Sequence, residues 1–189
     1  MRPFFFSYKS ISISWYMFFT LVSASFGYIM ASILATEYRE KKDKIQDIYL
    51  ILLIVGFIGA RFGYVLRHPD LYRDNIFSLF KLSHYNLSFL GGILSGFIAL
   101  IFISRIYGIA IEKLLSIFTT AFYLSMAIGI WVLRFDRLLL SLDHFKILLL
   151  SLMFLVGMVL ELALGRRFKN KYTSITILLA TVFAYYILI

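Results

Sequence analysis

The chain contains six apolar segments, each 18 to 24 residues long, joined by short polar connections. A helix needs about 20 apolar residues to cross the hydrocarbon core of a bilayer. Continuous apolar segments satisfy their backbone in lipid as helices, because the strands of a barrel would alternate polar and apolar residues. We therefore predict an all-α integral membrane protein, a bundle of about six transmembrane helices. The predicted spans cover residues 13–36, 48–66, 87–104, 114–133, 147–164 and 172–189.

The composition excludes an ordinary soluble protein. Hydrophobic residues make up 61% of the chain and charged residues only 15%, against about 25% charged residues in soluble domains. We expect residues 1–189 to form a single transmembrane domain. The absence of cysteine excludes disulfides, thiol catalysis and cysteine-based metal sites.

The net charge of +9 reflects membrane topology rather than nucleic-acid binding. The basic residues lie in the short connections between spans, where orientation and anionic lipid explain them. The first, third and fifth connections carry ten Lys and Arg, and the N-terminal tail with the other two connections carries eight. This bias predicts an N-terminus outside and a cytoplasmic first connection.

Arg61 is the one charged residue within the predicted span 48–66. A guanidinium at such a depth is unfavourable by about 3 kcal/mol on insertion scales unless it finds a partner or reaches the interface. Gly59 and Gly63 flank it and allow close approach. Two interpretations stay open: an anion or phospholipid head-group site, and an interface anchor that extends toward water.

Three motifs occur in order along the N-terminal part of the chain. Trp15-Tyr16 opens the first span, Gly-Ala-Arg-Phe-Gly-Tyr-Val-Leu closes the second at residues 59–66, and Ser-Phe-Leu-Gly-Gly opens the third at residues 88–92. Together they resemble the bacterial prolipoprotein diacylglyceryl transferases. The resemblance covers about the N-terminal two thirds of the chain, which would make it a short, divergent member.

The resemblance implies a place in the bacterial cytoplasmic (inner) membrane and a phospholipid partner. Members of this family move the diacylglyceryl group of phosphatidylglycerol onto a cysteine of a preprolipoprotein. By resemblance, Arg61 would contact the lipid phosphate through its bidentate fork, and Tyr16 would line the lipid cavity. The candidate lipid- or phosphate-binding residues are Arg61, Tyr64, Tyr16, Gly63, Ser88, Gly91 and Gly92.

Departures from the family pattern bear on catalysis. Leu90 stands where the family has His, and leucine can neither accept nor donate a proton. Val132 and Phe135 stand where we place the family's Arg and Asn, and the later Arg and Glu of the family have no counterpart. The catalytic residues are therefore unknown.

The remaining polar residues indicate no second site. His68 and His84 have no partner at ligand spacing, so we expect neither a metal nor a cofactor. Glu161 lies five residues before Arg166, which we interpret as a charge cluster at a helix end. Read alone, Gly91 and Gly92 fit close helix packing better than ligand binding.

Two functions remain. The chain is either a non-catalytic, lipid-binding relative, alone or as a subunit of a membrane assembly, or a divergent but active diacylglyceryl transferase that also binds a preprolipoprotein. A transporter is disfavoured because the spans show no inverted repeat.

Overall fold

In the computed structural model of the chain, residues 4–8, 11–72, 86–135, 142–168 and 171–189 are described. They confirm the predicted class. Five helical stretches have 19 to 26 residues and are apolar enough to cross a membrane, and a sixth apolar helix, Tyr172–Leu188, is shorter. The protein is therefore a multi-pass membrane protein. Its orientation, with the N-terminus outside, stays a prediction.

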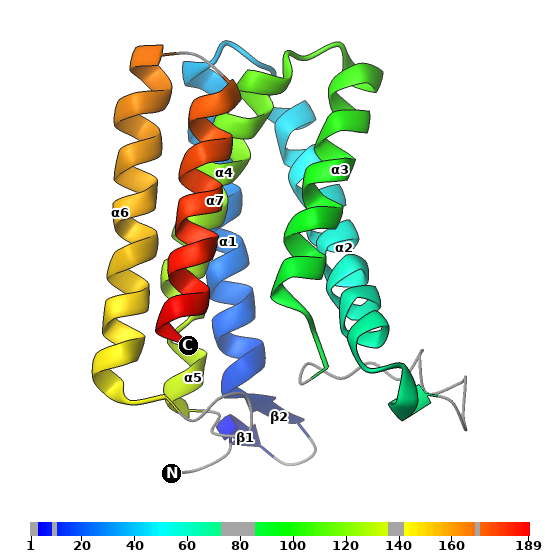
Figure 1. Cartoon of the computed structure of the whole chain (residues 1–189), viewed down its shortest axis with the longest axis vertical. Coiled ribbons are helices and arrows are strands. Elements are labelled where there is room, and N and C mark those ends of the chain that lie inside the picture. The colour runs from blue at the N-terminus through cyan, green and yellow to red at the C-terminus, as the bar shows by residue number, and fades with distance from the viewer. Residues whose placement is uncertain (1–3, 9–10, 73–85, 136–141, 169–170) are drawn as a thin grey trace. The chain divides into compact units, whose positions relative to one another are not determined.

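The chain divides into two compact units (Figure 1), one of residues 1–45 and 112–189 and the other of residues 46–111. The expectation of a single transmembrane domain stays a prediction.

The first unit begins with an antiparallel hairpin, β1 (Phe4–Tyr8) and β2 (Ile11–Ser14), that the sequence analysis did not anticipate. Aromatic and β-branched residues dominate both strands, and such residues favour extended backbone. Helix α1 (Trp15–Glu37) follows at once. The Ser14 side chain accepts a hydrogen bond from the Met17 amide at 3.2 Å, which caps the helix.

Four helices complete the first unit: α4 (Ile111–Gly129), α5 (Val132–Phe135), α6 (His144–Phe168) and α7 (Lys171–Leu188). The predicted fourth span, 114–133, lies within the apolar stretch Ile111–Phe135, which has a turn at residues 130–131 between α4 and α5. Ser151 of α6 donates to the Ala127 carbonyl of α4 at 2.8 Å. Phe154 packs against Phe122 of α4 and Tyr185 of α7, so α6 contacts both of these helices.

Glu161 lies inside this unit rather than at its surface. Its side chain is 0% exposed, and the Ser174 hydroxyl of α7 donates a hydrogen bond to its Oε1. The interpretation of Glu161 as part of a helix-end charge cluster was wrong. The sequence distance to Arg166 carries no information about the helix face on which Glu161 lies, and that face packs against α7.

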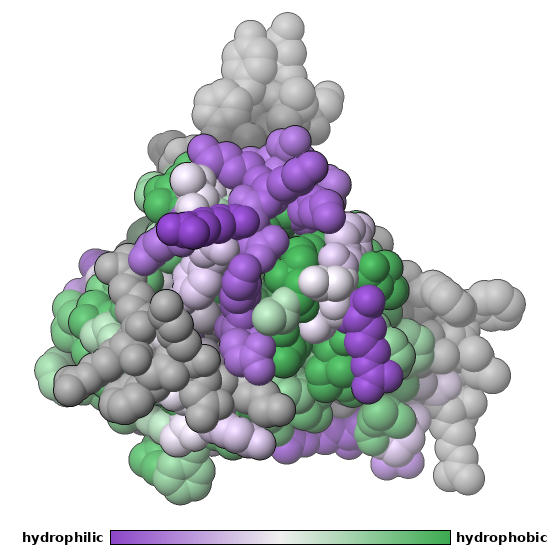
Figure 2. Space-filling view, turned by 90° about the horizontal axis from the view of Figure 1, so that it is seen from above, coloured by the Kyte–Doolittle hydropathy of each residue, from purple (hydrophilic) through white to green (hydrophobic). Residues whose placement is uncertain are grey.

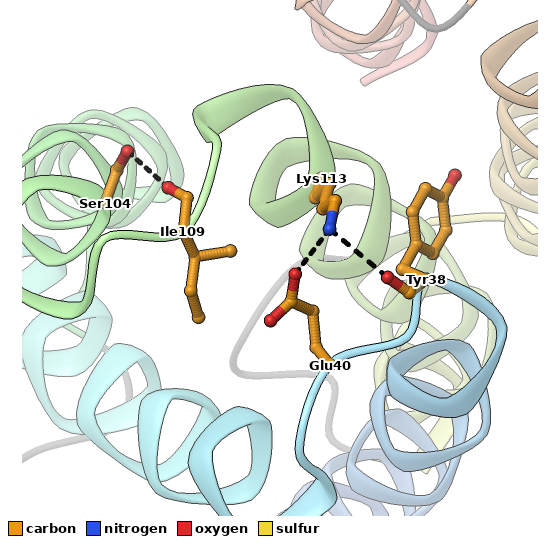
Figure 3. Close-up of polar contacts among 5 residues, drawn as sticks. All are labelled: Tyr38, Glu40, Ser104, Ile109 and Lys113. Carbon is orange, nitrogen blue, oxygen red and sulfur yellow. Dashed lines mark hydrogen bonds and ion pairs between the residues drawn. The ribbon is translucent and has the colours of Figure 1, made fainter.

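The loop after α1 carries an ion pair. Lys113 Nζ lies 2.6 Å from Glu40 Oε1 and donates to the Tyr38 carbonyl at 3.4 Å (Figure 3). Figure 2 looks onto the end of the molecule where this loop lies and shows hydrophilic residues gathered there.

The second unit is a helix pair, α2 (Lys42–Arg67, from residue 46 onward) and α3 (Phe89–Tyr107), with a 3-10 turn at Pro69–Tyr72. At the end of α3, Gly108 adopts φ +64°, a left-handed conformation that glycine favours. Ser104 donates to the Ile109 carbonyl at 2.8 Å and closes the turn (Figure 3).

Small residues let α2 and α3 approach closely. A Cβ built on Gly63 would lie 2.7 Å from the Gly91 Cα, and one built on Gly92 would lie 3.3 Å from the Gly56 carbonyl oxygen. A Cβ on Gly59 would overlap Ser95, whose hydroxyl donates to the Val55 carbonyl at 3.2 Å. This arrangement is a small-residue interface of the kind that membrane helices use to bring their backbones together.

Candidate functional site

Arg61 lies on α2, six residues before the helix ends at Arg67, a rise of about 9 Å. Its Nη1 donates to the Asn86 carbonyl at 3.2 Å. Its Cζ lies 5.4 Å from the centroid of the Tyr72 ring, which is within the range of a cation–π contact. The guanidinium is half-buried. These contacts hold it in one place, where its planar fork can face an anion.

Tyr72 is the residue of this site that the sequence did not reveal. It lies in the 3-10 turn after α2 and is only 8% exposed. Its hydroxyl is buried and has no hydrogen-bond partner among the described residues. A buried hydroxyl without a partner is unfavourable by about 1–3 kcal/mol, so a polar ligand beside Arg61 would satisfy it. No motif contains Tyr72, because turn residues lack the periodicity that identifies helices.

Ser88 joins the start of α3 to the Arg61 turn of α2. Its amide donates to the Ala60 carbonyl at 2.8 Å, and its hydroxyl accepts from the Gly91 amide at 3.2 Å. Ser88 is therefore the N-cap of α3. The first turn of a helix carries a partial positive charge, which favours an anion. The hydrogen bond from Ser88 to Ala60 holds this turn of α3 beside the residue that precedes Arg61.

The predicted glycines serve the helix contact. Gly63 and Gly91 meet backbone to backbone, and a Cβ on Gly91 would lie 2.9 Å from the Gly63 Cα. A Cβ on Gly92 would reach Ala60 at 3.5 Å. The structure thus assigns all three a packing role, and their contact with a lipid stays a prediction.

Tyr64 follows Arg61 by three residues, nearly one helical turn. Its ring stacks on that of His68, with centroids 4.4 Å apart, and His68 Nδ1 lies 3.2 Å from the Tyr64 carbonyl. Within the described ranges, no three His, Asp or Glu side chains come together to hold a metal ion. His84 lies outside the described residues.

Tyr16 lies on α1, in the first unit, and is half-buried. Its predicted place in the same lipid cavity as Arg61 stays a prediction.

One of the three positions that depart from the family pattern, Phe135, lies among aromatic rings. Phe135 stacks on Trp15, with ring centroids 4.2 Å apart, and lies 5.5 Å from the Phe19 ring. Val132 begins the short helix α5, and Leu90 lies in the first turn of α3. None of these side chains can supply a proton donor or an acceptor.

In comparisons with known proteins, one protein family matches the N-terminal part of the chain. The model of the family described as prolipoprotein diacylglyceryl transferase matches residues 3–132, which include Arg61, Tyr72 and Ser88.

Individual relatives carry the same description. A phosphatidylglycerol–prolipoprotein diacylglyceryl transferase of Caldanaerobacter subterraneus subsp. tengcongensis is 30% identical over 115 residues, 60% of this chain and 45% of the relative. The protein of this name from Finegoldia magna is 31% identical over 126 residues, 67% of this chain and 51% of the relative. The one from Streptococcus suis is 29% identical over 121 residues, 64% of this chain and 45% of the relative. The chain spans about half the length of the curated relatives it matches.

Proposed function

The chain belongs to the prolipoprotein diacylglyceryl transferase family, and from that premise we propose that it holds the head group of an anionic phospholipid at Arg61 without transferring the lipid. Phosphatidylglycerol, the lipid in the names of its relatives, is the head group that we propose. The bacterial inner membrane is the proposed location.

The observation that carries the proposal is the pairing of Arg61 with Tyr72. The guanidinium lies over the Tyr72 ring, and the buried Tyr72 hydroxyl has no partner in the described part of the chain. A phosphodiester offers an acceptor oxygen for the Tyr72 hydroxyl, and its negative charge complements the guanidinium. Hydrogen bonds from an Arg to a phosphate are also stronger than neutral ones. The capped first turn of α3, linked to Ala60, adds a favourable dipole.

The apolar substitutions support a non-catalytic role. Leu90, Val132 and Phe135 carry no group for proton transfer. Phe135 packs against the Trp15 and Phe19 rings of α1, which offer no hydrogen-bond acceptor on their faces comparable to a polar side chain. As a non-catalytic member, the chain would act alone or as a lipid-binding subunit of a membrane assembly. The competing function, active transfer to a preprolipoprotein, draws its support from the names of the relatives.

We expect the unaltered chain to fail to replace a diacylglyceryl transferase in a bacterial strain depleted of its own enzyme. The reason is that no side chain at Leu90 or Val132 can handle a proton. The measurement is growth together with lipidation of a reporter lipoprotein, with the Finegoldia magna relative as the positive control. Leu90→His alone is expected to restore neither. Full growth and lipidation by the unaltered chain would show that transfer is its function.

We expect Tyr72→Phe to weaken binding of phosphatidylglycerol about tenfold or more. The change removes one hydrogen bond to a charged group, which is worth about 1.5–3 kcal/mol, and 1.4 kcal/mol corresponds to a factor of ten. Tyr107→Phe, at the other end of the second unit, is the matched control and should leave affinity unchanged. The measurement is a titration of the purified protein in detergent with short-chain phosphatidylglycerol. Equal affinities for the two variants would remove Tyr72 from the site.

A further inference from the structure

The first unit contains an acidic side chain that the head-group proposal does not use. Glu161 lies on α6, seven residues before the helix ends at Phe168, and is 0% exposed. A rise of about 1.5 Å per residue places it roughly 10 Å from that end. Acidic residues at such positions in membrane helices are rare and are usually functional.

Hydroxyl groups from two helices face this carboxyl. Ser174 of α7 donates to Oε1, and Ser116 and Thr119 of α4 lie near the carboxyl. Gly165 leaves room for them, because a Cβ built there would lie 3.1 Å from Ser116 Oγ and 3.2 Å from Glu161 Oε1. Oε2 has no hydrogen-bond partner among the described residues.

No salt bridge to this carboxyl is found among the side chains that the structure describes, which do not include those of residues 166–171. Besides the hydroxyls, α4 brings Tyr123 near Glu161, and α7 brings Thr181 near Tyr123. Lys113, a cation of α4, pairs with Glu40. A buried, unpaired carboxylate is strongly unfavourable and is normally neutralised. A proton on Oε2 would remove the charge and turn the unpartnered oxygen into a donor.

A short chain of hydroxyls connects Glu161 with the end of the unit. The Tyr38 hydroxyl lies 2.6 Å from Ser116 Oγ. Ser116 Oγ and Glu161 Oε1 lie 3.1 Å and 3.2 Å from the same point, the position of a Cβ built on Gly165. Tyr38 is partly exposed and follows α1 directly, beside the Lys113–Glu40 ion pair (Figure 3). Each hydroxyl can donate one hydrogen bond while it accepts another, which is what passing a proton along such a chain requires.

We propose that Glu161 is a buried proton-binding site that exchanges its proton with the Tyr38 end of the molecule through the Ser116 hydroxyl. A hydronium ion gives one proton to the Tyr38 oxygen and leaves as water, and the original Tyr38 O–H bond breaks as a new O–H bond forms on Ser116. The original Ser116 O–H bond then breaks as an O–H bond forms on the Glu161 carboxylate. Both hydroxyls end with one proton each, and the carboxylate becomes neutral. This site rests on the first unit alone, so it stands or falls independently of the Arg61 site.

The test is infrared spectroscopy of the purified full chain in lipid bilayers at neutral pH. We expect a carbonyl stretching band of a protonated carboxyl that disappears in Glu161→Gln and persists in Glu37→Gln, whose side chain is exposed. Ser174→Ala should shift the band, because it removes the donor to Oε1. After transfer to heavy water, deuterium replaces the carboxyl proton and shifts the band. We expect Tyr38→Phe to slow the rate of this shift about tenfold, because one hydrogen bond of the route is lost and such a bond is worth about 1 kcal/mol. Tyr123→Phe, which keeps both relay hydroxyls, should leave this rate unchanged.

Each alternative has its own result. A spectrum that neither Glu161→Gln nor Ser174→Ala alters would overturn the proton site, because Glu161 would then be ionised. Loss of the band when sodium chloride replaces choline chloride would identify sodium as the neutralising ion and overturn the assignment to a proton. Equal exchange rates in Tyr38→Phe and Tyr123→Phe would overturn the route through Ser116.

Discussion

Replacing Gly63 by alanine is expected to destabilise the second unit by about 1–3 kcal/mol. The added Cβ would lie 2.7 Å from the Gly91 Cα, which is backbone and cannot rotate away. The two helices must therefore separate, and overpacking of this kind is unfavourable by about that amount. Gly91→Ala should act in the same direction, because its Cβ would lie 2.5 Å from the Gly59 carbonyl oxygen. The measurement is the free energy of unfolding of the purified protein in detergent.

Gly96→Ala is the matched control within α3. A Cβ at Gly96 meets nothing within 4 Å, and alanine favours a helix over glycine by about 1 kcal/mol. We therefore expect this variant to be neutral or slightly more stable. If Gly63→Ala and Gly91→Ala are as stable as Gly96→Ala, the close contact of α2 with α3 is contradicted.

The apolar pattern was sufficient to predict the helices but not the details at their ends. Spans of 18 or more apolar residues have one stable form in lipid, so the class of fold followed directly. The turn at residues 130–131, within the stretch that contains the fourth span, was not predicted, because the sequence stays apolar through Trp131 and Val132. The hairpin at β1 and β2 was missed because its short strands are as apolar as the helix that follows.

The candidate site was predicted in part, for reasons of residue chemistry. Arg61 is conspicuous because a single charge in an apolar span has few explanations. Tyr72 is not, because its position beside Arg61 depends on how the chain turns after α2. Glu161 was misplaced for a related reason: spacing along the sequence cannot distinguish the buried face of a helix from its exposed face when both are apolar.

Replacing Arg61 by leucine is expected to remove most of the bound phosphatidylglycerol while the helices stay inserted. Two charge-assisted hydrogen bonds from a bidentate guanidinium contribute about 1.5–3 kcal/mol each, so affinity should fall about 100-fold or more. Insertion should be unaffected or easier, because the change removes an unfavourable charge of about 3 kcal/mol from the span. Arg61→Lys should retain an intermediate affinity, since an ammonium group is a point charge without the planar fork.

Mass spectrometry of the phosphatidylglycerol bound per molecule of protein, compared across the unaltered chain, Arg61→Lys and Arg61→Leu, tests the head-group site most directly. The proteins are purified from the same membranes in the same detergent, and Arg105→Leu, at the far end of α3, controls for general loss of charge. We expect bound phosphatidylglycerol to decrease in the order Arg, Lys, Leu at position 61 and to stay unchanged in Arg105→Leu. If Arg61 only anchors α2 at the interface, Lys will substitute fully and Leu will leave the lipid content unchanged. Equal phosphatidylglycerol in all three forms would contradict a head-group site at Arg61.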